Sequence, residues 1–197
     1  MKTDAETIAL YDRRAEDYAQ FAGNPAESRI LQAFIDAIPF GGRVLDLGCG
    51  PGLSSARMVA AGLDVVATDA SAEMTRLARA NSAAEVRQEA FSELLDQAVY
   101  DGVWASFSLL HAPRSDFPHH LAAIHRAMRR GGRFHLGMKL GEGQKRDALG
   151  RLYTYYSEAE LEELLTAAQF NIVGRHTWQG KGLAGGTEPF IAVFAHA

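Results

Sequence analysis

The 197-residue sequence has little of what several protein classes depend on. It holds a single cysteine, Cys49, which excludes an internal disulfide and a multi-cysteine zinc cluster. Its longest apolar run is the six residues from Phe190 to Ala195, far short of the roughly 20 that a membrane helix needs. It has no long run of Lys or Arg, so an extended nucleic-acid-binding face is not expected. No secretory signal is visible near Met1, and we expect a cytoplasmic protein.

What the sequence does contain is typical of one globular domain. Apolar residues make up 47% of the chain and charged residues 22%, with a formal net charge of -4. This composition supplies a hydrophobic core that needs no disulfide or metal for support, and we expect a single domain over 1–197. The oligomeric state stays open, and small-molecule chemistry becomes the leading functional class.

Segments of helical and strand character alternate along the chain. The spacing of apolar residues predicts helices over about 4–20, 25–38, 53–61, from 71 onward, 116–130 and 157–168. Short β-rich runs predict seven strands over 44–47, 65–68, 85–88, 102–106, 133–138, 171–178 and 190–195. This alternation predicts an α/β fold with a doubly wound, mostly parallel sheet. Only the residues from Gln179 to Glu188 separate the last two strands, too few for a helical crossover, so the last strand is predicted to be antiparallel.

A glycine-rich turn follows the first predicted strand, with the sequence Asp46-Leu47-Gly48-Cys49-Gly50-Pro51-Gly52. Open α/β sheets bind their ligands at such a turn, because glycine permits positive φ angles and a close approach of the backbone. Asp69 ends the second predicted strand, 21 residues after Gly48, a separation that suits a carboxylate accepting hydrogen bonds from a ribose. The two features together predict a nucleoside pocket.

The same spacing is compatible with a nicotinamide dinucleotide, so the two ligands must be compared. The third glycine of a dinucleotide fingerprint would stand at position 53, which is Leu53. Pro51 removes a backbone donor that would face a diphosphate, and the Asp46 carboxylate suits a cationic amino acid better than a phosphate. These residues favour a ligand without phosphate, and a nicotinamide-dependent oxidoreductase is the alternative.

Four motifs carry a resemblance to a known family. They are Val44 to Gly52, Val66 to Asp69, the stretch from Tyr100 to His111, and Gly131-Gly132-Arg133. At these motifs the sequence resembles the class I S-adenosylmethionine-dependent methyltransferases, particularly the quinone-biosynthesis C-methyltransferases. The resemblance implies a Rossmann-like fold, S-adenosyl-L-methionine as methyl donor, S-adenosyl-L-homocysteine as product, and no metal.

The resemblance also implies which residues hold the donor. Gly48, Gly50 and Gly52 would surround its methionine part, Asp69 its ribose, and Ala70 and Met74 its adenine, while 106–109 would close the sulfonium end. The family usually places an acidic residue where this chain has Ala90, so either Glu89 substitutes after a one-residue shift or the backbone makes that contact. The donor-binding residues expected are Asp46, Gly48, Cys49, Gly50, Pro51, Gly52, Asp69, Ala70, Met74, Glu89, Ala90, Phe91, Ser106 and Leu109.

The acceptor is expected at the same edge of the sheet. His111 follows the fourth predicted strand and is the candidate catalytic residue, as a general base, a substrate hydrogen-bonder or a packed loop residue. We expect residues 1–40 to form a helical lid and the long loops after the fifth and sixth strands to complete the enclosure. The substrate residues expected are Tyr11, Tyr18, Arg151, Tyr153, Tyr155 and Trp178, and their character favours an anionic or aromatic acceptor.

The sequence therefore predicts an enzyme that transfers a methyl group by in-line displacement to a small molecule. Such a reaction requires chiefly alignment of the reactants and exclusion of water, so a dedicated base is optional. A non-catalytic module that binds S-adenosylmethionine is the further alternative. The identity of the acceptor does not follow from the sequence.

Overall fold

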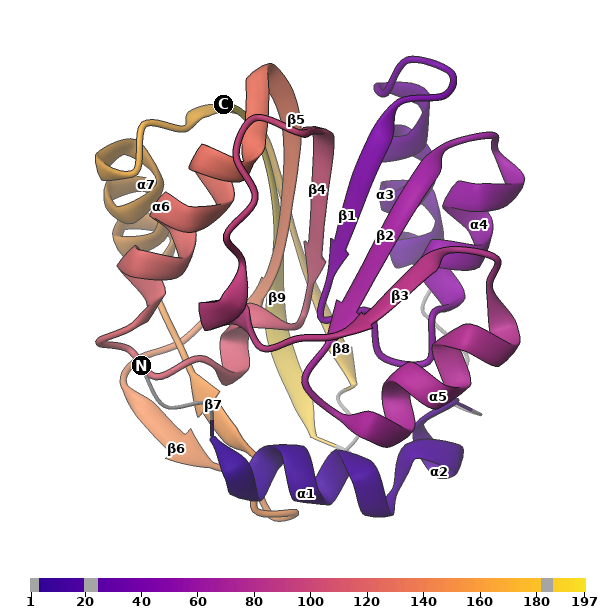
Figure 1. Cartoon of the computed structure of the whole chain (residues 1–197). Coiled ribbons are helices and arrows are strands. Elements are labelled where there is room, and N and C mark those ends of the chain that lie inside the picture. The colour runs from indigo at the N-terminus through magenta and orange to yellow at the C-terminus, as the bar shows by residue number, and fades with distance from the viewer. Residues whose placement is uncertain (1–3, 20–24, 182–185) are drawn as a thin grey trace.

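A seven-stranded sheet forms the centre of the computed structural model, which describes residues 4–19, 25–181 and 186–197. The strand order is β3-β2-β1-β4-β5-β9-β8 (Figure 1). The strands are β1 (Arg43–Leu47), β2 (Asp64–Asp69), β3 (Glu85–Gln88), β4 (Tyr100–Ser106), β5 (Met128–Lys139), β8 (Asn171–Lys181) and β9 (Thr187–His196). Strand β9 runs antiparallel to both of its neighbours, β5 and β8, and the remaining pairs are parallel. The predicted doubly wound sheet with an antiparallel last strand is confirmed.

Helices cover both faces of this sheet (Figure 1). Helices α3 (Pro25–Asp36), α4 (Leu53–Ala60) and α5 (Ala72–Asn81) lie on one side, and α6 (Phe117–Ala127) and α7 (Glu158–Ala167) lie on the other. Two short 3-10 turns, η1 (Phe91–Glu93) and η2 (Leu109–His111), follow β3 and β4. Within the described ranges, no helix combines the length and the apolar character needed to cross a membrane.

The periodic apolar residues of these helices are what attach them to the sheet. On α3, Leu31, Phe34 and Ile35 are buried against residues of the sheet that include Val44 and Trp104. A larger cluster on the other face joins residues of α6 and α7 to β4 and β5. Burying a side chain of this size contributes about 1.5–3 kcal/mol to the free energy of unfolding, so these contacts hold the helices firmly on the sheet.

The start of the chain does not form the single helix predicted over 4–20. It forms two helices, α1 (Ala5–Arg13) and α2 (Ala15–Ala19), separated at Arg14, whose φ of -121° leaves the helical range. The break places Ala15 in a small buried cluster with Met74 and Leu77 of α5. Contact with α5, rather than the local sequence, therefore decides where the first helix ends.

Two further predictions for the second half of the chain were wrong. The helix predicted over 116–130 ends at Ala127, because Met128 already pairs with Tyr100 as the first residue of β5. Gly131-Gly132, interpreted as the helix stop, thus lies inside that strand beside an irregularity in the pairing. The region expected to be a long loop after the fifth strand contains a small hairpin of β6 (Gln144–Arg146) and β7 (Leu152–Thr154).

The carboxyl ends of the parallel strands meet at one edge of the sheet, and α1 and α2 lie across that edge. In Figure 1 they extend from the β6–β7 hairpin at one end to α5 at the other. Helix α1 contacts α5 directly, and polar bonds join it to the hairpin, as Thr7 Oγ1 accepts from Leu152 N at 2.9 Å. Any ligand bound at this edge would therefore lie beneath α1 and α2.

Candidate active site

The glycine turn between β1 and α4 is shaped by close packing as well as by positive φ angles. Gly48 has a φ of 74°, and a Cβ added there would lie 2.3 Å from the Ser108 Cβ. Gly52, at 80°, would place a Cβ 2.8 Å from the Ala78 Cα. Gly48 thus lets the turn lie directly against the segment that follows β4, while Gly52 lets α4 approach α5. At Gly50 the space is more open, with a Tyr18 ring carbon 3.7 Å from the corresponding Cβ position.

The Asp69 carboxylate joins the end of β2 to this turn. Its Oδ2 accepts from Gly50 N at 3.0 Å, and its Oδ1 accepts from Ser71 N at 2.9 Å. Burial raises the pKa of Asp69, while these backbone hydrogen bonds oppose that effect. Each carboxylate oxygen can accept a second hydrogen bond, so the group can fix the turn and still accept from a ribose hydroxyl.

Two cavities meet at the glycine turn. The first is lined from α1 and α2 by Asp4, Thr7, Ile8, Tyr11 and Tyr18, and otherwise by Gly48, Gly50, Asp69, Ala70, Met74, Phe91, Ser92, Ser106, Phe107, Ser108, His111, Ala112, Pro113, Asp116 and His120. The second is lined by Tyr18, Glu27, Asp46, Gly48, Cys49, Gly50, Pro51, Leu53, Ser54, Trp104, Ser106 and Phe107. Tyr18, Gly48, Gly50, Ser106 and Phe107 line both. An elongated ligand could therefore extend from one cavity into the other across the turn.

Most of the residues expected at the donor line one of these cavities. Those that do are Asp46, Gly48, Cys49, Gly50, Pro51, Asp69, Ala70, Met74, Phe91 and Ser106. Gly52, Glu89, Ala90 and Leu109 do not. Leu109 is fully buried in the core, and Ala90 N donates to Glu93 Oε2 at 2.7 Å, so the η1 turn uses that backbone group itself.

The electrostatics of the second cavity are dominated by carboxyl groups. Asp46 is 2% exposed and accepts a hydrogen bond from Ser55 Oγ at 2.6 Å. Burial raises the pKa of Asp46 to about 7, and the nearby Asp69 adds to the effect. Burial likewise raises the pKa of the Cys49 thiol, which disfavours the thiolate that a nucleophile would need. Among the described residues, no group of three or more His, Cys, Asp or Glu side chains is arranged to hold a metal.

Several cavity residues were not expected from the sequence. Thr7 and Ile8 come from α1, while Asp116 and His120 come from the start of α6. Phe107, in contrast, belongs to the segment 106–109 expected at the sulfonium end, and it is a non-glycine residue with a φ of 54° that lines both cavities. Strained backbone of this kind is often kept at functional sites.

His111 is held by two hydrogen bonds that define its protonation. Its Nδ1 lies 2.6 Å from the carbonyl oxygen of Leu152, which can only accept, so Nδ1 carries the proton. Its Nε2 lies 2.8 Å from the Tyr11 hydroxyl. Burial lowers the pKa of His111 to about 4, so the ring is neutral and Nε2 accepts the Tyr11 proton as a hydrogen bond.

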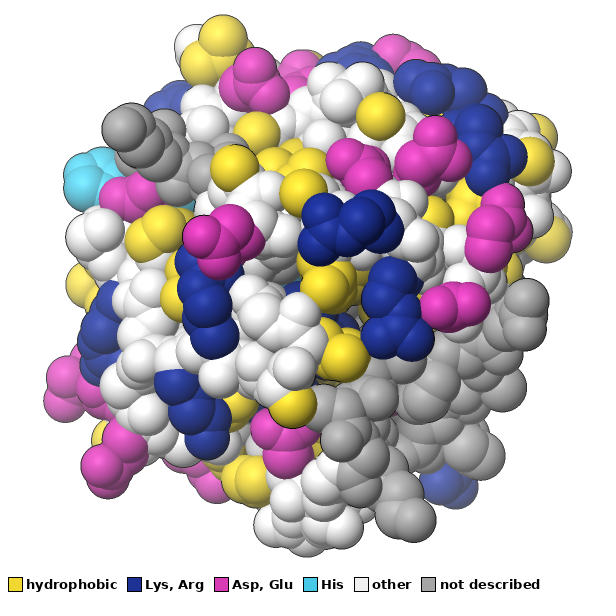
Figure 2. Space-filling view, turned by 90° about the horizontal axis from the view of Figure 1, so that it is seen from below, with side chains coloured by type: hydrophobic (Ala, Val, Ile, Leu, Met, Phe, Trp, Pro, Cys, Tyr) yellow, Lys and Arg dark blue, Asp and Glu magenta, His cyan; other side chains and the backbone are white. Residues whose placement is uncertain are grey.

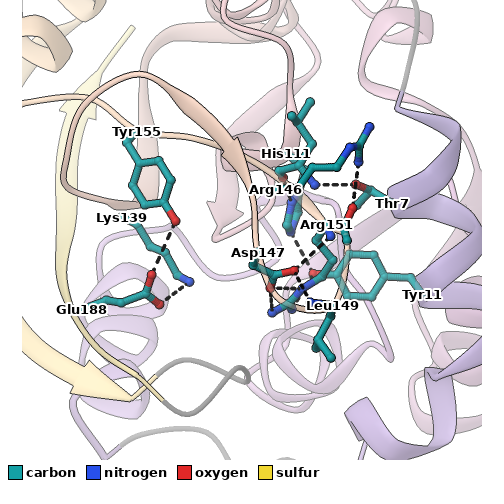
Figure 3. A network of polar contacts seen from close by, with 12 residues as sticks. Thr7, Tyr11, His111, Lys139, Arg146, Asp147, Leu149, Arg151, Tyr155 and Glu188 are labelled. Atoms are coloured by element: carbon teal, nitrogen blue, oxygen red, sulfur yellow. Dashed lines mark hydrogen bonds and ion pairs between the residues drawn. The ribbon is translucent and has the colours of Figure 1, made fainter.

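Charged and aromatic side chains form a network of polar contacts around Tyr11 and His111 and to one side of them (Figure 3). Arg151, 2% exposed, donates to the Tyr11 oxygen at 3.3 Å and to Asp147 Oδ2 at 2.9 and 2.6 Å. Lys139 is paired with Glu188, and its Nζ lies 4.0 Å from the centre of the Tyr153 ring. The basic side chains of this network are thus neutralised by carboxylates of the same chain.

Of the six residues expected at the substrate, two line a cavity and four do not. Tyr11 and Tyr18 line the first cavity. Arg151, Tyr153, Tyr155 and Trp178 line neither cavity. Tyr153 lies against His111 with 4.7 Å between ring centres, and Trp178 lies edge-on to Phe107 at 6.1 Å, so these two contact residues that line the cavities.

The chain is similar in sequence and in fold to known methyltransferases. A family model described as a methyltransferase domain matches residues 44–132. Among solved structures, the chain is similar to the 1,6-didemethyltoxoflavin-N1-methyltransferase of Burkholderia thailandensis, whose structure holds 1,6-didemethyltoxoflavin and S-adenosylhomocysteine. The two share 27% identity and a TM-score of 0.76, covering 98% of this chain and 87% of that one.

Two further solved structures share the fold. An S-adenosylmethionine-dependent methyltransferase from Methanosarcina mazei has 18% identity and a TM-score of 0.73, with 89% of this chain and 98% of that one covered. One from Mesorhizobium loti has 20% identity and a TM-score of 0.69, with 88% and 99% covered. No curated protein sequence is similar enough to this chain to match it.

Proposed function

We propose that this chain, which belongs to the class I S-adenosylmethionine-dependent methyltransferases, methylates a small molecule bound beneath helices α1 and α2. The observation that carries the proposal is the pair of cavities meeting at the glycine turn under those two helices. The Burkholderia relative is a methyltransferase of 1,6-didemethyltoxoflavin, which also supports a small acceptor here.

The two cavities suit the two ends of S-adenosylmethionine. In this arrangement the adenosine occupies the first cavity, where Asp69 accepts from the ribose and Ala70 and Met74 contact the base. The amino acid end occupies the second cavity, where Asp46 and Glu27 face a cationic ammonium group. The sulfur then lies at the junction, beside Gly48 and Phe107.

Helices α1 and α2 act as the lid in this proposal. Asp12 of α1 accepts from Ser71 Oγ at 2.6 Å and from Glu73 N at 3.2 Å, which fastens the lid to the start of α5. At its other end, Arg146 of the hairpin donates to Asp4 at 3.0 and 2.8 Å. We restrict the lid to the described residues 5–19, since α3 is packed into the core.

The described surface around α1 and α2 shows no continuous stripe of one charge that would suit a nucleic acid. Figure 2 shows it as a mixture of Lys and Arg with Asp and Glu side chains and apolar patches. Many of these charges are already paired, as Arg76 is with Glu16 and Glu73. A phosphate-binding surface would need unpaired basic side chains along a continuous stripe.

The chain's own residues provide alignment and exclusion of water. When bound, S-adenosylmethionine supplies a methyl group on a positively charged sulfur. The rings of Tyr18 and Phe107 enclose the junction and keep water away from it, while the glycine turn and Asp69 fix the direction from which an acceptor approaches.

The proposal is tested with methyl-labelled S-adenosylmethionine and cell extract separated by filtration into low-mass and macromolecular fractions. We expect the protein to transfer label only in the low-mass fraction, with the product identified by mass spectrometry. Transfer of label to protein or nucleic acid alone, with none in the low-mass fraction, would contradict a small-molecule acceptor.

A further inference from the structure

We infer that Tyr11 and His111 together take up a proton from the acceptor, so that the acceptor is a neutral molecule with an N–H or O–H at the atom that is methylated. The inference rests on the proposed function and names the substrate class of that site. It combines three observations: the position of the two side chains, the direction of their hydrogen bonds, and the charges that line the cavities.

The two side chains are connected to the glycine turn by direct contacts. Tyr18 lies over Gly50, and the Tyr11 ring meets the Tyr18 ring edge-on with 5.5 Å between centres. Tyr11 and His111 both line the first cavity, and the Tyr11 hydroxyl lies 2.8 Å from His111 Nε2, so an acceptor bound in this cavity can approach the pair. No other described residue links this cavity to the Nε2 of His111 by a hydrogen bond.

The hydrogen bonds run in one direction. Because Nδ1 of His111 donates to the Leu152 carbonyl, its Nε2 has the free electron pair that accepts from Tyr11. Arg151 donates to the Tyr11 oxygen from the other side, which stabilises negative charge on that oxygen as its proton leaves. The Tyr11 oxygen can therefore receive a proton from the cavity while its own proton passes to His111.

The step balances in atoms and charge. The acceptor atom bonds to the methyl carbon, the carbon–sulfur bond breaks and its electron pair returns to sulfur, and the acceptor proton moves to Tyr11 as the Tyr11 proton moves to His111 Nε2. One positive charge is lost at sulfur and one is gained at the imidazole. The site therefore keeps its net charge, and Asp147 partly offsets the charge on the ring.

The lining of the cavities argues against an anionic acceptor. Of the described residues that line the two cavities, none is a Lys or Arg, whereas Asp46, Asp69, Asp116 and Glu27 are among them, as is Asp4, which is paired with Arg146. The nearby cations, Arg151 and Lys139, are buried and held by Asp147 and Glu188. An anion would thus meet carboxylates with no Lys or Arg among the described lining residues to balance it, which disfavours the anionic acceptor considered from the sequence.

The charged and titratable groups around His111 predict the pH dependence. Tyr11 faces it from α1, Tyr153 and Arg151 from the hairpin and its turn, Lys139 from β5, and Asp147 from the same turn. Burial and the two cations lower the pKa of His111, while the Leu152 carbonyl and Asp147 raise it, with a net value of about 4. Such a weak base can deprotonate the acceptor because methylation makes the bound N–H or O–H strongly acidic. We expect kcat to be constant above about pH 5 and to fall below it.

The first test measures turnover of the low-mass extract acceptor by Tyr11→Phe and His111→Asn. The asparagine amide can still donate to Leu152 but provides no base. We expect kcat to fall about 100-fold or more in both variants, with S-adenosylhomocysteine affinity changed less than threefold. The matched control is Tyr156→Phe, a buried tyrosine whose hydroxyl has no described partner and lines neither cavity, and which should keep kcat within twofold.

The results that would overturn the inference are distinct from failure of the proposed function. A Tyr11→Phe enzyme with kcat within threefold of the wild type would overturn it, as would a wild-type kcat that rises between pH 8 and 10. A product that is a methyl ester or a quaternary ammonium ion would also do so. Absence of any low-mass product would instead refute the small-molecule acceptor.

A second readout needs no acceptor. Nitrogen-15 NMR of histidine-labelled protein with S-adenosylhomocysteine reports which imidazole nitrogen of His111 carries the proton. We expect the Nδ1–H form to persist from pH 8 to pH 5, and the Nε2 signal to shift in Tyr11→Phe. An Nε2–H form, or an imidazolium at pH 7, would overturn the inference even if methyl transfer occurs.

Discussion

At the residue scale, Asp69 and the glycine turn depend on one another. The carboxylate holds Gly50 N and Ser71 N, so it fixes the turn and the start of α5 before any ligand binds. From the sequence, the interval between Gly48 and Asp69 predicted a nucleoside pocket, and the two residues do lie at the carboxyl ends of adjacent parallel strands. The backbone hydrogen bonds themselves were not predictable from spacing alone.

Replacing Asp69 tests its place in the donor site. Asp69→Ala should weaken S-adenosylhomocysteine binding by about 1–3 kcal/mol, since a buried acceptor of hydrogen bonds is lost. Calorimetric titration measures this directly. The control is Asp64→Ala at the opposite end of the same strand, where an exposed carboxylate pairs with Arg43 and binding should be unchanged. Equal affinity in the wild type and both variants would show that Asp69 does not contribute to donor binding.

Gly48 and Gly131 form a matched pair that separates backbone strain from close packing. Both have φ angles near 75°, but a Cβ at Gly131 meets nothing within 4 Å, whereas one at Gly48 collides with Ser108. Gly131→Ala should cost about 1–2 kcal/mol of the free energy of unfolding. Gly48→Ala should cost about 1–3 kcal/mol more, measured by urea denaturation. Equal losses of unfolding free energy in the two variants would show that Ser108 can move aside without an energetic cost.

At the scale of elements, the sequence predicted the sheet better than it predicted the parts that enclose the cavity. The seven strands of the sheet carry strong β patterns and appear close to their predicted positions. The β6–β7 hairpin was missed because Gln144, Lys145 and Arg146 are all exposed and show no alternation. Its position depends on partners far away in the sequence, such as Asp4, which no local pattern indicates.

The same reason explains what was missed at the site. Thr7 and Ile8 line the first cavity only because α1 crosses the sheet edge, and its bonds join residues more than 100 positions apart, as between Tyr11 and Arg151. The early end of α6 is similar, since Met128 leaves the helix to pair with Tyr100. Tertiary contacts decide these features, and the local sequence is compatible with either outcome.

Arg146→Ala tests the attachment of the lid. Removing this side chain breaks one of the attachments between the start of α1 and the hairpin, and we expect amide hydrogen exchange over residues 5–13 to rise about twofold to fivefold at pH 7. The control is Arg129→Ala, which breaks an exposed pair with Asp101 away from the lid. Unchanged exchange in α1 would mean that its contacts with α5 and its bonds to Leu152 and Arg151 suffice to hold it.

Acid should loosen the same attachment. Arg146 and the Thr7 hydrogen bonds lower the pKa of Asp4 to about 2, below its ordinary value near 4. Because the folded state favours the ionised form, the stabilisation is present above about pH 4 and is lost as the pH falls toward 2. The ion pair between Asp4 and Arg146 should therefore persist throughout the neutral range.

At the scale of the whole molecule, His135 connects stability to pH. It is 1% exposed, stacks on Trp104 with 3.8 Å between ring centres, and its Nδ1 has no partner among the described residues. Burial lowers its pKa to about 3. Between about pH 6.5 and 3 the unfolded chain therefore binds a proton that the folded chain does not, so the free energy of unfolding falls as the pH is lowered.

His135→Phe should reduce this dependence on pH. The substitution keeps an aromatic ring against Trp104 and removes the titrating group, so the loss of unfolding free energy between pH 6.5 and 4 should be smaller than in the wild type. Urea denaturation at both pH values measures it, with the exposed His119→Phe as control. The same loss in His135→Phe as in the wild type would show that other groups account for the acid sensitivity.

The account depends most on where the donor's sulfur lies, which a crystal structure with S-adenosylhomocysteine measures directly. We predict the adenosine in the first cavity, the amino acid end in the second, and the sulfur beside Gly48, Ser106 and Phe107, with open space leading from it to the Tyr11 hydroxyl. A sulfur found elsewhere, or one separated from Tyr11 by packed side chains, would contradict both the arrangement of the site and the proton path built on it.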